Sequence, residues 1–457
     1  MICSVCRHCG LCEGSETKKN VSVLADFSGL ENLKGDNSLP LNFVGIAFDI
    51  GTTSIAANIF TLKDGILVAS VGEENCQIEF GSDVVSRILF SSKPSGLKKL
   101  HESILSQIER ISKKLILASQ NFFVENRRGR AVLKRIVISG NTAMESFVLG
   151  ISAVSLAQFP FSLPSKFGFS VESNELGNFE TIPPDCEFYF APAIESFVGG
   201  DTVCAMIACG FLEKVENKFL ADIGTNCELC VYSAESDKIF CASTSAGPAF
   251  EGYGIDCGIS AQEGAIAKVE FLKNNEIKCF VLGNGKAIGI CGTGILSAIS
   301  EFLKSGIIDF FGTFVSGKEK IILQNEIYIC QKDIRNFQLA KSAVLTGLEI
   351  LSEKSGCKSG TLYLAGGFGS LLDIKDACAV KMIPSFLSEK TFAAGNASLC
   401  GASILLLNLG LRKSACELAE NSVHVDLAQD KSFENLYIKN LNFKSVSYTH
   451  LRAHETL

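Results

Sequence analysis

Two stretches of the chain repeat the same order of apolar and polar segments. In the first, the pattern predicts a strand over 44–48, a Gly-Thr-Thr turn, a strand over 54–62, an Asp-Gly hairpin and a strand over 66–71. The later stretch "FLADIGTNCELCVYSAESDKIFCASTS" again gives strand, turn, strand, polar turn and strand. Asp-Ile-Gly-Thr opens both turns, at positions 49 and 222, and that separation is too long for a solenoid repeat. The pattern therefore predicts a duplicated domain.

Helices are predicted in both halves. A 3.6-residue apolar period runs over 97–115, and two more helices are predicted over 292–306, where Gly306 is a fitting stop, and over 337–356. In each half an apolar strand also ends in glycine just before a helix, at "RIVISGNTAM" and "TLYLAGGFGS". The predicted architecture is two related α/β domains with a cleft between them.

Composition agrees with a folded protein and excludes several function classes. Of the 457 residues, 47% are apolar and 20% are charged, and the net charge is −7. The acidic balance argues against nucleic acid or anionic lipid as a partner. No apolar run reaches the roughly 18–20 residues of a membrane span, and the first residues lack the pattern of a secretory signal. We therefore expect a cytoplasmic protein.

The first Asp-x-Gly-Thr turn suits phosphate binding. Glycine lets the backbone approach a phosphate without steric strain from a Cβ atom. The N–H groups of Gly51, Thr52 and Thr53, with the two hydroxyls, can donate hydrogen bonds to phosphate oxygens. Asp49 cannot bind phosphate directly, but it can hold a Mg²⁺ that bridges phosphates, usually through water.

The second turn offers the same groups, from Asp222, Gly224, Thr225 and Asn226. One such turn alone is weak evidence, because plain hairpins share the pattern. Two copies, each matched by a later strand-to-glycine turn, favour a triphosphate held between two facing turns. Two other glycine-rich segments, over 283–289 and 312–319, miss the dinucleotide and P-loop patterns and are expected to be ordinary turns.

These motifs resemble those of the ASKHA superfamily, which includes acetate and sugar kinases, Hsp70, hexokinase and actin. "DIGTTS" is similar to its phosphate-1 motif, "DIGTNCE" to its phosphate-2 motif and "LAGGFGS" to its adenosine motif. The resemblance implies duplicated ribonuclease-H-like α/β domains with ATP bound in the cleft between them.

Longer motifs, in order from about residue 44 to 443, resemble the reductive activators of corrinoid proteins. They are "QIEFGSDVVSRI", "SGNTAMESFVLG", "ESFVGGDTVCA", "STSAGPAFEGYGI", "GICGTGILSAISEFLKSGIID", "QKDIRNFQLAKSAV" and "AGGFGS…IP…AGNASLCGA". The resemblance implies ATP-driven transfer of one electron from an iron–sulfur cluster to a Co(II) corrinoid, which restores the Co(I) state. It also implies a corrinoid protein and an electron donor as partners, and a homodimer.

The resemblance carries over site residues one by one. Asp49 and Asp222 are expected to be the catalytic carboxylates and to hold Mg²⁺. Gly140 and Asn141 fit a plain strand-to-helix turn equally well. The residues expected to contact ATP are Gly51, Thr52, Thr53, Gly140, Asn141, Gly224, Thr225, Asn226, Gly366, Gly367 and Gly369.

Four cysteines follow one another at three-residue intervals near the start of the chain: Cys3, Cys6, Cys9 and Cys12. C-x₂-C-x₂-C supplies three ligands of a [4Fe–4S] cluster in bacterial ferredoxins, so we expect an iron–sulfur cluster here. Cys12 would complete the set or leave the fourth position to an outside ligand. Zinc is the main alternative, but Cys₄ zinc sites usually separate two C-x₂-C pairs by a longer hairpin.

The chain departs from the family in three places. Known activators carry a plant-type [2Fe–2S] domain or C-terminal clusters, whereas this chain shows only the short cysteine segment. Cys227 stands where the family usually has glycine; with Cys230 it forms a second C-x₂-C, expected on a strand with the two thiols on opposite faces. "SYTHLRAHETL" resembles a translated sequencing adapter, so His450 and His454 are not expected to be ligands.

The expected layout has five parts: an iron–sulfur segment over 1–14, a flexible linker over 15–42, a middle domain over 43–205, a C-terminal domain over 206–446 and a foreign tail over 447–457. Three alternatives for the function stay open. They are an ATPase that reduces another low-potential acceptor of the dehydratase or double-cubane type, a small-molecule kinase, and an iron–sulfur redox sensor that uses nucleotide as a signal.

Overall fold

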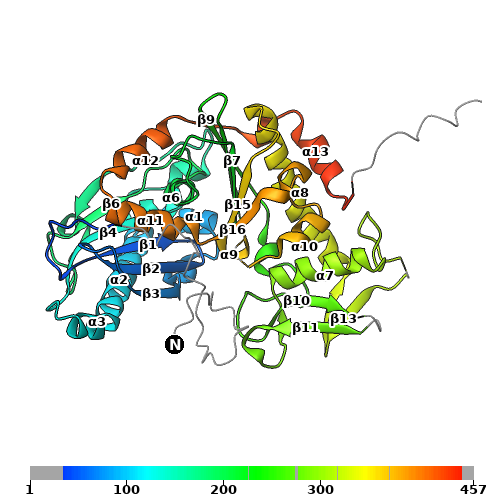
Figure 1. Ribbon diagram of the computed structural model, residues 1–457, viewed down its shortest axis with the longest axis horizontal. Coiled ribbons are helices and arrows are strands. Elements are labelled where there is room, and N and C mark those ends of the chain that lie inside the picture. The colour runs from blue at the N-terminus through cyan, green and yellow to red at the C-terminus, as the bar shows by residue number, and fades with distance from the viewer. Residues whose placement is uncertain (1–33, 225, 273–275, 316, 370, 445–457) are drawn as a thin grey trace, which may run out of the picture.

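The computed structural model describes residues 34–444, except 225, 273–275, 316 and 370. Two six-stranded sheets dominate the described part of the chain, and we call the regions around them the first and second lobes (Figure 1). The cysteine segment and the end of the chain, for which sequence predicts an iron–sulfur site and a foreign tail, lie outside the described residues.

The first sheet has the strand order β3-β2-β1-β4-β6-β5. β1 and β2, and β2 and β3, are antiparallel, whereas β4 is parallel to β1 and to β6. The strands are β1 (Phe43–Ile50), β2 (Ser54–Thr61), β3 (Leu67–Glu74), β4 (Val132–Gly140), β5 (Ser170–Glu172) and β6 (Glu187–Phe190).

The second sheet repeats this plan, with the order β16-β15-β7-β8-β9-β17. β7, β8 and β9 form an antiparallel meander, and β15 runs parallel to β7 and to β16. The duplication predicted from the repeated turns is therefore confirmed. The strands are β7 (Lys218–Ile223), β8 (Cys227–Ser233), β9 (Lys238–Thr244), β15 (Thr361–Ala365), β16 (Thr391–Gly395) and β17 (Ser422–His424).

Helices cover both sheets, and the predicted helices are present. The helix predicted over 97–115 lies within α2. The helix predicted over 292–306 starts where α7 starts and ends two residues after it, and the helix predicted over 337–356 covers the greater part of α8. The helices are α1 (Val84–Ser91), α2 (Gly96–Ala118), α3 (Gln120–Glu125), α4 (Thr142–Leu149), α5 (Ser173–Leu176), α6 (Gly200–Ala208), α7 (Gly292–Lys304), α8 (Gln331–Ser355), α9 (Gly366–Gly369), α10 (Ile374–Ala379), α11 (Ala397–Leu407), α12 (Leu411–Glu420) and α13 (Phe433–Asn440).

Two helices join the lobes. α11, from late in the chain, packs against β1 and β4 of the first sheet and against α6, as Figure 1 shows in orange beside blue and green. A Cβ atom on Gly401 would lie 1.9 Å from the carbonyl oxygen of Cys204, so only glycine allows the two helices to approach this closely. One apolar core runs through this layer and includes Ala47 from the first sheet and Leu220 from the second. The expected domain boundary at 205/206 falls inside α6 and stays a prediction.

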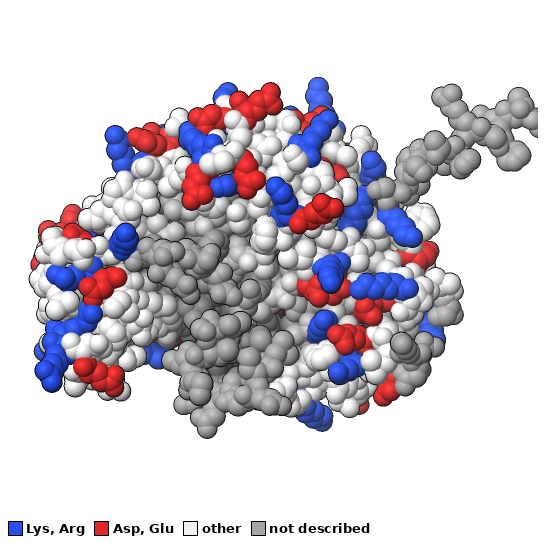
Figure 2. Space-filling view, in the orientation of Figure 1, with Lys and Arg blue, Asp and Glu red and all other residues white. Residues whose placement is uncertain are grey.

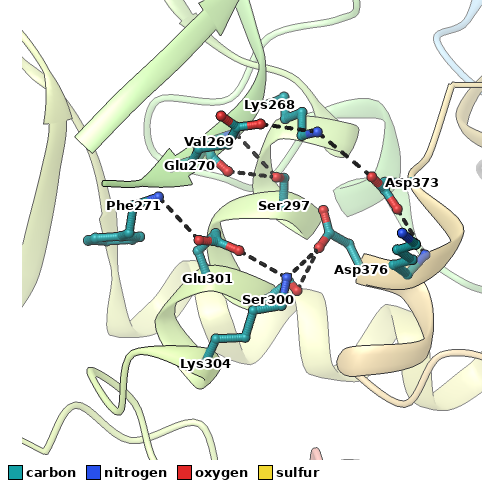
Figure 3. Close-up of polar contacts among 11 residues, drawn as sticks. Lys268, Val269, Glu270, Phe271, Ser297, Ser300, Glu301, Lys304, Asp373 and Asp376 are labelled. Carbon is teal, nitrogen blue, oxygen red and sulfur yellow. Dashed lines mark hydrogen bonds and ion pairs between the residues drawn. The ribbon is translucent and has the colours of Figure 1, made fainter. Parts of the chain in front are cut away.

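The second lobe carries small sheets formed by β10 (Ala265–Phe271), β11 (Ile277–Val281), β12 (Gly289–Ile290), β13 (Lys320–Gln324) and β14 (Ile327–Cys330). A polar network fixes α7 between β10 and α10 (Figure 3). Buried Asp376 accepts hydrogen bonds from Ser300 Oγ at 2.7 Å and Lys304 Nζ at 3.1 Å, and Glu301 accepts from the N–H of Phe271 at 3.1 Å. The network holds the helix that begins with the Gly-Thr-Gly motif.

The second cysteine pair, the helix lengths and the surface charge can each be compared with the sequence predictions. Cys227 and Cys230 both lie on β8, fully buried, and pack into different cores on opposite faces of the sheet, as predicted. No helix within the described ranges is long and apolar enough to cross a bilayer. On the face shown in Figure 2, acidic and basic side chains alternate instead of forming a patch of one sign.

Candidate functional site

The two repeated aspartates lie at the same place in the two sheets. Asp49 and Asp222 each precede the last residue of a central strand, β1 or β7. Side chains alternate along a strand, so Asp49 shares a face with Ala47 and Asp222 shares a face with Leu220. Both apolar residues belong to the core between the lobes. The strand period therefore turns both carboxylates toward the junction of the lobes.

Asp201 is a third carboxylate at this junction, in the first turn of α6. Its charge raises the pKa of Asp222, and the charge of Asp49 raises the pKa of both Asp201 and Asp222. Burial is the larger cause, and all effects together bring the pKa of Asp201 to about 6 and that of Asp222 to about 8. Negative charge on Asp49 therefore disfavours ionisation of Asp201 and Asp222.

Two side chains from the second half of the chain hold Asp49. Asn396 Nδ2 donates a 2.8 Å hydrogen bond to Asp49 Oδ2, and Ser398 Oγ donates one of 2.8 Å to Asp49 Oδ1. Asn396 also caps α11, because its Oδ1 accepts from the N–H of Leu399 at 2.8 Å. Burial raises the pKa of Asp49, and these two hydrogen bonds oppose that effect.

The phosphate-1 turn is built by local hydrogen bonds. Gly51 donates its N–H to the carbonyl of Ser54 at 2.9 Å and accepts from Asn75 Nδ2 at 2.8 Å, while the Thr53 carbonyl accepts from the Asn75 N–H at 2.9 Å. A Cβ atom at position 51 would lie 2.9 Å from the Ser54 carbonyl oxygen. The turn therefore needs glycine at 51, and Thr52 and Thr53 lie between its hydrogen-bonded ends.

The strand-to-helix turn at Gly140 and Asn141 adjoins the phosphate-1 turn. Asn141 caps α4 by accepting from the N–H of Met144 at 3.0 Å, and its Nδ2 donates to Thr52 Oγ1 at 3.2 Å. A Cβ atom on Gly140 would lie 2.8 Å from the carbonyl oxygen of Ile50. The two readings left open by the sequence are thus compatible: these residues form a structural turn, and that turn touches the first phosphate motif.

The phosphate-2 and adenosine motifs are also in contact. Gly224 donates its N–H to the carbonyl of Asn226 at 2.9 Å, and the Asn226 side chain is exposed. Gly366 has φ +84°, and a Cβ atom on it would lie 2.5 Å from Asp222 Oδ1. Gly367 has open space around its Cβ direction, and Gly369 lies close to Leu364 of β15. Thr225 lies outside the described residues.

Phe250 joins three of the sequence motifs. Its ring stacks on Phe368 of the "LAGGFGS" turn at 4.5 Å between centroids and meets Phe337 of α8 edge-on at 5.8 Å. Its carbonyl oxygen would lie only 1.9 Å from a Cβ atom on Gly292, the first residue of α7. The "AGPAFEG", "CGTG" and "LAGGFGS" segments therefore pack against one another in the core of the second lobe.

The sequence reasoning missed several polar residues of this site. Asp201 and the pair Asn396 and Ser398 lie within motifs that carry the family resemblance, but no local pattern marks them as polar neighbours of Asp49. Glu228 pairs with Asp222 across β7 and β8, and burial together with Asp201 and Asp222 raises the pKa of its carboxyl well above the ordinary value. Its place in the repeated turn-and-strand unit was a usable signal.

The donor set fits Mg²⁺. Asp49 and Asp222 supply hard carboxylate oxygens, which this ion prefers over nitrogen or sulfur, and Asp201 adds a third negative charge near them. Their mutual repulsion gives a divalent cation a physical reason to bind among them. A different group among the described residues, Asp256, Cys330 and Asp333, also has ligand atoms near one another. There Asp333 accepts from the N–H groups of Asp256 and Cys330 at 2.9 Å each, so it serves as a cap for α8.

Comparison with known proteins gives a consistent result. Residues 44–214 match the family described as the RACo middle region, and residues 216–454 match the C-terminal domain of RACo, the ASKHA domain. The corrinoid activation enzyme RamQ of Eubacterium limosum is 31% identical, over 87% of this chain and 70% of the relative. The Co(II) methylated amine-specific corrinoid protein reductase of Methanosarcina barkeri is 26% identical, over 87% of this chain and 77% of the relative.

A solved structure gives the same answer. The reductive activator for corrinoid, iron–sulfur protein superposes with a TM-score of 0.75 at 28% identity, over 88% of this chain. The present chain spans 66% of that protein, just under two thirds of its length. The family match, the relatives and the duplicated sheets together confirm the predicted ASKHA fold, and the chain belongs to the family of reductive activators of corrinoid proteins.

Proposed function

We propose that this protein uses ATP hydrolysis to drive one-electron reduction of the cobalt in a corrinoid protein, from Co(II) to Co(I). The observation that carries the proposal is the family match over both lobes, together with relatives named for corrinoid activation and reduction. The electron comes from a reduced donor protein, and ATP and water become ADP and phosphate.

The carboxylates at the junction have separable roles in this proposal. Asp49 and Asp222 hold Mg²⁺ from opposite lobes. The turns at Gly51–Thr53 and Gly224–Asn226 bind the phosphates. When bound, Mg²⁺ neutralises phosphate charge and orients the chain of phosphates. Asp201 belongs to neither turn and has a pKa of about 6. Because it lies in the first turn of α6, outside both phosphate turns, its carboxylate is free to act on the attacking water as a general base, and we assign it that role.

The electron-transfer parts rest on residues outside the described range. We propose that Cys3, Cys6, Cys9 and Cys12 ligate the iron–sulfur cluster, which supplies the single electron. A [4Fe–4S] cluster accounts best for the three-residue spacing of these cysteines. We also propose that the protein is a homodimer, that a separate protein donates the electron and that the location is cytoplasmic. ATP binding between the lobes favours a closed state because ATP contacts both turns, whereas ADP and phosphate release this link.

A direct test combines anaerobically purified protein, reconstituted with iron and sulfide, with a reduced donor and a candidate corrinoid protein. Absorbance of the corrinoid reports the Co(II) and Co(I) states. Formation of Co(I) only with ATP present supports the proposal. Reduction of a double-cubane protein but not of any corrinoid protein would place the chain with the alternative activators, and a phosphorylated small-molecule product would make it a kinase.

A further inference from the structure

We propose that Asn396 and Ser398 are positioning residues, which fix the orientation of the Asp49 carboxylate for Mg²⁺ and connect the metal site to the helix layer between the lobes. This inference rests on the proposed function, because it assigns Asp49 to the metal. It goes further by assigning a role to the start of α11, a segment that belongs to neither phosphate turn.

The hydrogen bonds leave the carboxylate oriented but still able to bind a cation. Each oxygen of Asp49 accepts one side-chain hydrogen bond, one from Asn396 and one from Ser398, at 2.8 Å in both cases. A carboxylate has about four lone-pair positions, so further positions stay available on both oxygens. Two donors on different oxygens also prevent rotation of the carboxylate about its Cβ–Cγ bond.

A hydrogen-bond chain fixes Ser398 in turn. Ser398 Oγ lies 2.8 Å from Ser139 Oγ of β4, and the Ser139 side chain is fully buried. A hydroxyl has one proton, and Ser398 gives its proton to Asp49, so Ser139 must be the donor in this contact. The chain therefore runs from Ser139 to Ser398 to Asp49. Ser139 is also the residue of β4 that pairs with Asp49 of β1, which closes the arrangement on the sheet.

The same helix also sets the position of Asp201. α11 packs against α6 through the close approach of Gly401 and Cys204, and α6 carries Asp201 in its first turn. The first turn of α11 thus holds the Asp49 carboxylate, and the middle of α11 packs against α6, the helix that carries Asp201. A shift of α11 relative to the first sheet would change the separation of Asp49 and Asp201, which gives the metal site a mechanical connection to the lobes.

The test measures divalent cation binding by the full-length protein in the presence of ADP. Mn²⁺ is the probe, and electron paramagnetic resonance detects how much of it is bound. Ser398→Ala removes one donor to Asp49 and is expected to weaken Mn²⁺ binding about 10- to 100-fold, the usual effect of losing a partner of a metal ligand. Ser398→Thr keeps the hydroxyl and should restore affinity. Asn396→Ser keeps an oxygen that can cap α11 but withdraws the amide donor, and it should also weaken binding.

Ser403→Ala is the matched control. Ser403 is a buried serine of the same helix whose hydroxyl donates to the carbonyl of Leu399 at 2.7 Å and does not touch Asp49. It should bind Mn²⁺ as the unaltered protein does. Equal Mn²⁺ affinity in Ser398→Ala and Ser403→Ala would overturn the proposal, whether that affinity is unchanged or weakened in both variants. If Ser398→Ala does not fold, the comparison of Asn396→Ser with Ser403→Ala decides in the same way.

ATPase measurements add a second readout. At saturating Mg²⁺ the KM for ATP of Ser398→Ala should stay close to that of the unaltered protein, while the Mg²⁺ concentration for half-maximal rate rises. A purely structural defect would lower the rate at every Mg²⁺ concentration, and that result would contradict a positioning role. An unaltered protein that binds Mn²⁺ and ADP but hydrolyses no ATP would refute the proposed function, while the Mn²⁺ comparison would still decide this inference.

Discussion

Gly366 lies so close to Asp222 that a Cβ atom on it would come within 2.5 Å of the carboxylate oxygen Oδ1. The contact joins the adenosine turn to the phosphate-2 turn, and the φ of +84° at Gly366 favours glycine on a second ground. The two motifs are therefore one structural unit, and a substitution in the first should disturb the second.

Gly366→Ala is expected to weaken ADP binding by about 5- to 150-fold, because the added methyl group must displace Asp222 or the turn, at a cost of order 1–3 kcal/mol. Isothermal titration calorimetry checks this. Gly356→Ala is the control: its φ is +73° but nothing lies within 4 Å of its Cβ direction, so it shares the backbone strain without the contact. Similar ADP affinities for the two variants would show that the contact with Asp222 does not matter.

Asp201→Asn should lower kcat for ATP hydrolysis by about 10²- to 10⁴-fold, the usual range for loss of a general base. KM for ATP should change little, because Asp201 belongs to neither phosphate turn. Steady-state kinetics at saturating Mg²⁺ separate the two constants. A rise in KM with kcat unchanged would mean that Asp201 binds nucleotide and does not act on water.

The stability of the metal-free protein should fall as pH rises from about 4 to 8. Asp201 and Asp222 have pKa values of about 6 and about 8 in the folded protein, above the ordinary value of 3.8 for both. The folded state therefore binds more protons than the unfolded state in this window, so the stabilisation present at low pH is lost as these groups ionise. Thermal unfolding across this pH range measures the effect. Mg²⁺ should reduce the slope at pH 8, and Asp222→Asn should flatten it; a slope unchanged by this substitution would contradict the assignment.

Replacing Cys6 and Cys9 together by serine should abolish iron binding and electron transfer, while ADP binding stays unchanged, because the nucleotide site is formed by other residues. Iron content and calorimetry measure the two properties separately. Cys227→Ala is a suitable control, because that thiol is buried in the apolar core of the second lobe. Normal iron content in the Cys6 and Cys9 double variant would refute the cysteine cluster.

The sequence was informative where structure is local. The alternation of strands and the glycine turns predicted the three-stranded unit at the start of each sheet, because each repeated unit folds from neighbouring residues. The predicted start of one helix was wrong: α8 begins at Gln331, before the predicted 337, because Asp333 forms a capping box with Cys330 that the apolar period does not reveal. Contacts such as Asn396 with Asp49 join residues 347 positions apart and depend on how α11 packs, so no local pattern could predict them.

We propose that ATP hydrolysis at the junction of the lobes drives cobalt reduction. The most direct measurement follows corrinoid absorbance in the reconstituted system with ATP, with a non-hydrolysable ATP analogue, and with the Asp201→Asn protein plus ATP. We expect repeated formation of Co(I) with ATP and the unaltered protein, and little or none in the other two reactions. Equal Co(I) formation with the analogue, or with the Asp201→Asn protein, would refute the coupling of hydrolysis to cobalt reduction.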